Sequence, residues 1–122
     1  MRSLSPAHTA ACLRHLRAAL PQAKIILTGH ESQYSAYSEA CDIEGIAGDT
    51  RGLSIQEVMA LLPRIDLLVC PDSCLGHAAA VSACPVVSYW CAFPSRARIP
   101  WYPQQYPIEI KLPCSPCWQH ET

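Results

Sequence analysis

The sequence has no excess of positive charge: nine Lys and Arg residues stand against ten Asp and Glu residues, and the net charge at pH 7 is −1. Because binding to a phosphate backbone depends on Lys and Arg, nucleic acid is not an expected partner. Long apolar runs are also lacking, since Pro, Asp, Ser or His interrupts them before the ~20 residues that a membrane span needs. The N-terminal residues show no continuous apolar signal core. Together these absences predict a soluble protein of the cytoplasm.

Cysteine, by contrast, is abundant, with eight residues among 122. A disulfide framework is typical of shorter secreted chains that lack a sizeable core, whereas 122 residues suffice for one domain with a core. Five cysteines occur singly in apolar or small-residue stretches, where a thiol behaves as a small hydrophobe. They are Cys12, Cys41, Cys70, Cys84 and Cys91. We expect most of them to be buried thiols in a reducing compartment.

Helix and strand signals alternate along the first 90 residues. Ser5 and Pro6 are typical of a helix start, and Ser54 with Glu57 forms the sequence pattern of a capping box. The expected helices span residues 6–20, 31–41, 54–63 and 73–83, and the expected strands span 24–29, 42–48, 65–70 and 85–90. Because the strand segments are short apolar runs, they are expected to be buried, with 42–48 the weakest of them. The alternation predicts an α/β fold with a parallel sheet flanked by helices.

The last 29 residues break this alternation. Six prolines lie between Pro94 and Pro116, and proline removes backbone donors and fixes φ. We expect residues 94–122 to form an extended, loop-like tail, with one candidate strand at 108–112. The tail is assigned to the same domain as residues 1–93.

Polar side chains follow the apolar run at 65–70, in the stretch LLVCPDSCLGHAAAVSACPVV (67–87). A strand-to-helix junction lies at the carboxyl edge of a parallel sheet, where open α/β folds bind ligands. The helix start favours an anion there, Asp72 or Ser73 can cap the helix, and His77 leans back toward the same edge. The alternative interpretation is that Asp72 and Ser73 only cap the helix while the His77 ring packs.

At these residues the chain resembles a known family. The stretch DLLVCPDSCLGHAAAVSACPVVSYW is similar to the strand, Asp-Ser/Thr-Gly-x-x-His motif, Ala-rich helix and Pro-Val-Val strand of the heptosyltransferases, glycosyltransferase family 9. Three further stretches resemble the family in matching order: IILTGHES, GDTRGLSIQEVMALLPRID and LPCSPCW. The resemblance covers residues 5–118 and rests on the ordered series more than on any single motif.

The resemblance implies a GT-B enzyme with two Rossmann-like domains, of which this chain matches the C-terminal, donor-binding one. The resemblance implies that Asp72, Ser73, Cys74 and His77 lie beside the diphosphate and sugar of the donor. It also implies that Glu31 contacts the ribose and that Leu53 and Ser54 lie on the nucleobase side. The donor would be a nucleotide sugar resembling ADP-heptose, used in lipopolysaccharide biosynthesis. No resident cofactor is implied.

Some features depart from the family pattern. Cys74 stands where the family usually has Gly, and its side chain would crowd a diphosphate lying against the backbone. Glu31 follows Gly29 by only two residues, so its role depends on a shortened loop. Three parts of the family's fold have no counterpart here. They are the first strand with its phosphate-binding turn, the acceptor domain with the catalytic base, and the final helices. We therefore expect a truncated domain that is inactive alone. Because one edge of its sheet is open, we expect it either to associate with itself or to depend on a separate acceptor-binding chain.

Two further groups keep alternatives open. Cys114 and Cys117 have ligand spacing for half a sulfur metal site, yet plain structural thiols or a redox pair suit the same spacing. Arg96 and Arg98 either reach a phosphate or are solvated surface residues.

The sequence as a whole favours the donor-binding domain of an inverting glycosyltransferase. Two alternatives from other classes are a non-enzymatic α/β binding or assembly module and a small Cys-x-x-Cys metal or redox protein.

Overall fold

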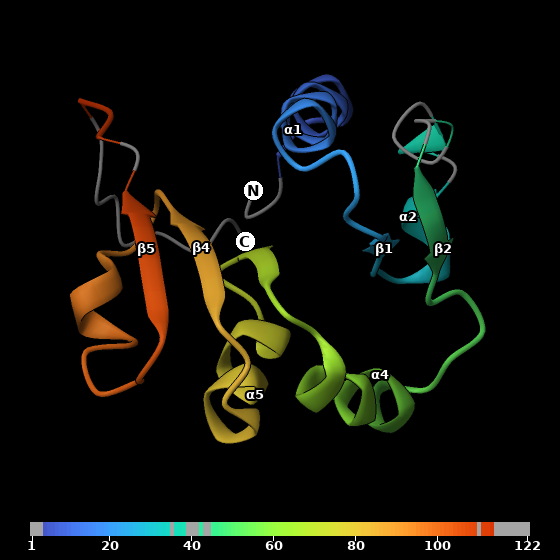
Figure 1. Cartoon of the computed structure of the whole chain (residues 1–122). Coiled ribbons are helices and arrows are strands. Elements are labelled where there is room, and N and C mark those ends of the chain that lie inside the picture. Colours follow the sequence, from blue (N-terminus) through green and yellow to red (C-terminus); the bar gives the residue numbers. More distant parts are fainter. Residues whose placement is uncertain (1–3, 35, 39–41, 43–44, 110, 114–122) are drawn as a thin grey trace. The chain divides into compact units, whose positions relative to one another are not determined.

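A computed structural model describes residues 4–34, 36–38, 42, 45–109 and 111–113, and the chain divides into two compact units (Figure 1). One unit is Leu4–Val58, and the other holds the described residues from Met59 onward. Both contain parallel strands flanked by helices, so the predicted Rossmann-like α/β class is confirmed.

The elements follow one another in the predicted alternation. In chain order they are α1 (Pro6–Ala19), β1 (Ile25–Leu27), α2 (Glu31–Tyr34), β2 (Ile46–Asp49), α4 (Ile55–Leu61), the 3-10 helix η1 (Leu62–Arg64), β3 (Leu68–Pro71), α5 (Cys74–Ser82), β4 (Val86–Trp90), the 3-10 helix η2 (Ser95–Ala97) and β5 (Gln105–Glu109).

Helix α1 begins as predicted. Ser5 is its N-cap, and the Ser5 hydroxyl accepts a hydrogen bond from the backbone N–H of His8 at 3.3 Å. Pro6 fits the first turn because its missing N–H would have no partner there. At the other end, the N–H of Leu20 donates to the carbonyl of Leu16, and the helix stops before Pro21.

Strands β1 and β2 pair in parallel, with Leu27 opposite Asp49. The prediction of a buried strand at 24–29 is wrong in its burial, because Ile26 is 46% exposed. Strand β2 begins at Ile46, four residues later than expected. Of the helix expected at 31–41, the single turn Glu31–Tyr34 is described; residues 35 and 39–41 lie outside the described residues.

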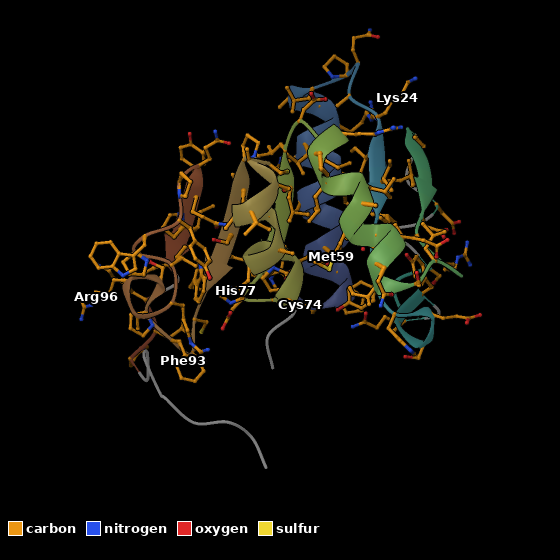
Figure 2. All side chains as sticks on the ribbon, turned by 90° about the horizontal axis from the view of Figure 1, so that it is seen from below. Lys24, Met59, Cys74, His77, Phe93 and Arg96 are labelled. Carbon is orange, nitrogen blue, oxygen red and sulfur yellow. The ribbon has the colours of Figure 1, made fainter. Side chains whose placement is uncertain are left out.

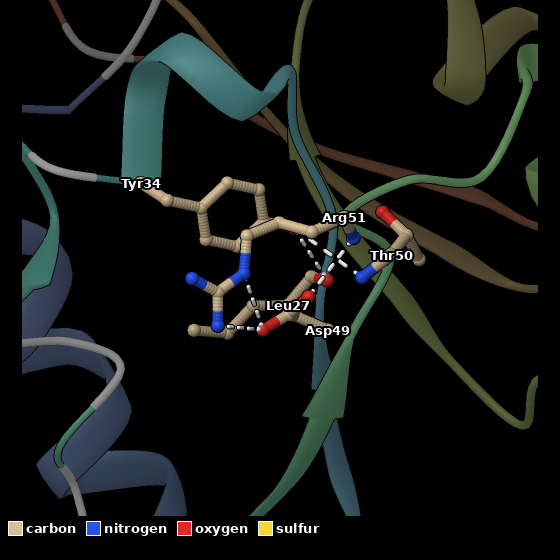
Figure 3. Close-up of polar contacts among 5 residues, drawn as sticks. All are labelled: Leu27, Tyr34, Asp49, Thr50 and Arg51. Atoms are coloured by element: carbon tan, nitrogen blue, oxygen red, sulfur yellow. Dashed lines mark hydrogen bonds and ion pairs between the residues drawn. The ribbon is translucent and has the colours of Figure 1, made fainter.

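A polar cluster closes the carboxyl ends of β1 and β2 (Figure 3). The Leu27 carbonyl accepts from the Thr50 N–H at 3.0 Å and from the Tyr34 hydroxyl at 3.2 Å. Arg51 lies over the Tyr34 ring, 4.9 Å from its centroid, and pairs with Asp49 at 2.7 Å. Hydrogen bonds from the Arg51 side chain and backbone lower the pKa of Asp49.

The capping box at the start of α4 is confirmed. The Ser54 N–H donates to Glu57 Oε2 at 2.8 Å, and the Glu57 N–H donates to Ser54 Oγ at 3.3 Å. The hydroxyl and the backbone N–H of Ser54 both donate to the Glu57 carboxylate and lower the pKa of Glu57. Helix α4 ends at Leu61, and Pro63 does not end the helical segment at once, because the 3-10 helix η1 continues it through Arg64.

In the second unit, β3, β4 and β5 form a parallel sheet in that order, and α5 packs on one face (Figure 1). The helix and the sheet bury a shared core of Leu62, Leu68, Cys70, Ala79, Cys84 and Val86. Along β4, Val86, Ser88 and Trp90 are buried while the residues between them are partly exposed. This alternation puts these three side chains on the α5 face of the sheet.

The proline-rich segment contributes a strand to this sheet, three residues earlier than the expected 108–112. Strand β5 (Gln105–Glu109) pairs with β4 and includes Pro107, which an edge strand tolerates because one side of its backbone needs no partner. Residues 105–109 therefore correct the prediction of a loop-like tail. Ser95, at the start of η2, donates from its N–H and its hydroxyl to Glu109 Oε1, each at 2.8 Å. These bonds lower the pKa of Glu109.

The prediction of buried thiols holds for two of the five cysteines. Cys70 and Cys84 are buried, and burial raises the pKa of Cys70 to about 11. It is wrong for Cys12 and Cys91, which are exposed on the outer side of α1 and just after β4. Cys41 lies outside the described residues.

Among the described helices, none has the length and hydrophobicity that crossing a bilayer requires.

Candidate functional site

The junction between β3 and α5 has the form that the sequence predicts. Pro71 ends the strand, Ser73 is the extended N-cap residue with φ −147°, and Cys74 begins a nine-residue helix. The prediction that a side chain caps this helix is wrong for Ser73, which makes no capping hydrogen bond. Burial raises the pKa of the nearby Cys70 thiol, and the Ser73 side chain offsets part of this rise.

Asp72 and His77 are brought together one helical turn apart. Asp72 Oδ1 lies 3.5 Å from His77 Nε2, and the two side chains are 12% and 34% exposed. The His77 ring also meets the ring of Tyr102 in an edge-to-face contact, with centroids 5.7 Å apart and planes at 85°. His77 is thus held between a carboxylate and an aromatic ring, and still reaches solvent.

A small open pocket, with a volume of about 10 Å³ and so room for about one water molecule, lies beside this pair. Its wall combines the junction and the first turn of α5 with the facing side of the sheet. The lining residues are Pro71, Asp72, Ser73, Gly76, His77, Ser88, Trp90, Ile99 and Gln105. Such a volume is below the ~300 Å³ at which pockets for whole small molecules begin. It suits one hydroxyl or one phosphate oxygen, so a larger ligand would lie across the mouth.

Six lining residues were not predicted from the sequence as site residues: Pro71, Gly76, Ser88, Trp90, Ile99 and Gln105. Ser88 and Trp90 are joined by a 2.8 Å hydrogen bond from Trp90 Nε1 to Ser88 Oγ. A serine alternating with Val86 and Trp90 in the run at 85–90 was a usable signal, because it puts a hydroxyl on the buried face. Ile99 and Gln105 had no such signal.

Cys74 begins α5 but is exposed and is not among the residues that line the pocket. Figure 2 labels Cys74 and His77 on α5, with Phe93 and Arg96 on the segment that follows β4. A ligand spanning the pocket mouth and the start of α5 would pass the Cys74 side chain.

Three of the residues expected to contact the donor, Glu31, Leu53 and Ser54, belong to the other unit. Glu31 is the exposed first residue of α2, and Leu53 is 43% exposed. The Ser54 hydroxyl is already used in the capping box, where it donates to Glu57 at 2.7 Å.

Arg96 and Arg98 are both exposed. Arg98 lies over the Phe93 ring, 4.7 Å from its centroid, and Arg96 lies close enough to Glu109 to lower its pKa further. These contacts agree with surface roles. Cys114 and Cys117 lie outside the described residues, and within the described part no cluster of three or more His, Cys, Asp or Glu side chains could hold a metal ion.

Residues 10–122 match the sequence model of glycosyltransferase family 9 (heptosyltransferase). The chain belongs to this family. No curated protein and no solved structure shows a significant match to it. Family membership implies a glycosyltransferase, and therefore a nucleotide-sugar donor and an acceptor as ligands. In this glycosyltransferase family 9 chain, the Asp72–His77 pair and the small pocket beside it lie within the matched residues.

Proposed function

We propose that this chain contains the donor-binding domain of an inverting glycosyltransferase, and that the sugar-diphosphate part of the donor binds at the β3–α5 junction. The observation that carries the proposal is the Asp72–His77 pair at 3.5 Å over a pocket at the carboxyl end of a parallel strand. Ligands of open α/β sheets bind at such ends. The donor proposed is a nucleotide sugar resembling ADP-heptose.

The two halves of this site suit different parts of the donor. The unpaired N–H groups at the start of α5 favour the negative charge of a diphosphate. A carboxylate repels phosphate but accepts hydrogen bonds from hydroxyl groups. Asp72, only 12% exposed, therefore takes a sugar hydroxyl, while His77 is placed to donate to the donor from the pocket rim.

The chemistry proposed is direct displacement at the anomeric carbon. The acceptor oxygen forms a bond to this carbon as the bond to the diphosphate oxygen breaks, and a base elsewhere takes the hydroxyl proton. The start of α5 stabilises the charge on the departing nucleoside diphosphate. The resemblance puts the base on the acceptor domain, so the 122-residue chain is not expected to transfer sugar. Turnover by the pure chain that disappears in Asp72→Ala would contradict this expectation.

Calorimetric titration of the 122-residue chain with ADP, an ADP-sugar and a UDP-sugar tests the donor site. We expect millimolar or tighter binding of at least one of the three. The chain must show a cooperative thermal transition in the same buffer. A folded chain that binds none of them would sink the donor-site proposal and favour the non-enzymatic assembly module instead.

Cys74→Gly is expected to tighten binding of ADP several-fold, since it removes the side chain that a diphosphate at the start of α5 would meet. Cys74→Ser is the matched control, because it keeps a side chain of similar size at the same exposed position. Equal affinities for the Gly and Ser variants would show that crowding by residue 74 does not limit binding.

A further inference from the structure

Two side chains from the part of the chain after β4 contact the first turn of α5, at the consecutive residues Gly76 and His77. The Tyr102 ring packs edge-to-face on His77, and Gln105 Nε2 donates a 2.9 Å hydrogen bond to the carbonyl of Gly76. Both contacts come from outside α5 and join residues 25 to 29 positions apart in the chain. They meet the helix where it faces the pocket.

The segment that carries these two side chains is itself well anchored. Ile99 is buried with Trp90 and Phe93, and Tyr102 packs against this cluster. The Tyr102 N–H donates to the Ile99 carbonyl at 3.2 Å.

The entry into β5 is equally constrained. Gln104 has φ +59°, a left-handed conformation that is costly for a residue with a side chain. Its carbonyl accepts from the Val86 N–H at 2.9 Å, which ties this turn to β4. The turn delivers Gln105 to the start of β5 with its side chain on the α5 face, where it lines the pocket.

We propose that Tyr102 and Gln105 are positioning residues for His77. Tyr102 restricts the imidazole ring through its edge-to-face contact, and Gln105 holds the helical turn from which His77 projects. The ring is then kept within reach of Asp72 and the pocket without having to be ordered when a ligand arrives, which lowers the entropic cost of binding. The consequence for donor affinity rests on the proposed function; the effect on the His77 ring does not.

Proton NMR of the 122-residue chain tests the positioning directly, with His77→Gln used to assign the His77 ring signals. Tyr102→Phe keeps the aromatic edge and should leave the His77 signals in place. Tyr102→Leu removes the ring current and the contact, so these signals should move. Tyr106→Leu is the matched control: Tyr106 is 60% exposed on β5, and its loss should not change the His77 signals.

Titration with ADP gives the second readout. Tyr102→Leu should weaken binding about two- to tenfold, the range of an aromatic pair, whereas Tyr102→Phe and Tyr106→Leu should bind as the parent chain does. Gln105→Met keeps the length of the side chain and removes the donor. It should both move the His77 signals and weaken ADP binding about two- to tenfold.

The outcomes separate the two proposals. If the parent chain binds no ADP or ADP-sugar, the donor site fails while the His77 signals still decide the positioning. Unmoved His77 signals in both Tyr102→Leu and Gln105→Met would overturn the positioning even if ADP affinity fell. Should Tyr102→Leu fail to fold, Gln105→Met decides in the same way.

Discussion

Trp90→Ala is expected to lower the free energy of unfolding of the unit that contains β3, β4 and β5 by about 3–5 kcal/mol. Trp90 is 3% exposed and packs with Phe93 and Ile99. Truncation opens a cavity the size of an indole, and it also leaves the Ser88 hydroxyl, itself 2% exposed, without the Trp90 donor. Denaturant unfolding followed by circular dichroism measures the loss.

The chain offers a matched control for this change. Trp101 is 88% exposed, so Trp101→Ala makes the same substitution without a cavity and should alter stability by less than about 0.5 kcal/mol. Trp90→Phe separates the two contributions at the buried position, because it keeps an aromatic ring and removes the N–H. Similar losses for Trp90→Ala and Trp101→Ala would contradict the packing described for β4.

Asp72→Asn is expected to weaken binding of an ADP-sugar about tenfold or more, the usual strength of a hydrogen bond to a charged group. The same change should leave binding of ADP unchanged or slightly tighter, since it removes a negative charge close to the diphosphate. The advantage of ADP-sugar over ADP should therefore disappear. Parallel calorimetric titrations of both ligands measure this difference.

Asp66→Asn is the control for charge alone. Asp66 is exposed, lies just before β3 and does not line the pocket, so its loss should change neither affinity. An equal loss of ADP and ADP-sugar binding in Asp72→Asn would mean that Asp72 does not act on the sugar. The proposed division of the site into a sugar half and a phosphate half would then be wrong.

The sequence by itself determined the features that depend on neighbours within a few positions. The Ser5 cap and the Ser54–Glu57 capping box are bonds across three residues, and both occur as predicted. The start of α5 after Pro71 and the run of β4 were also predicted, because a proline and a short apolar run act locally. The sequence also predicted that His77 leans toward the edge of the sheet that carries Asp72, although not that the two side chains pair at 3.5 Å.

Only the tertiary structure decided the features that join distant parts of the chain. The side chain of Ser73 does not cap α5, and Cys12 is exposed although its neighbours are apolar. Strand β5 includes Pro107 because it lies at a sheet edge, and an edge is a property of the assembled sheet. The inner wall of the pocket depends on Gln105 reaching Gly76, 29 positions earlier. Such contacts are selected by how elements pack, which no local pattern of residues encodes.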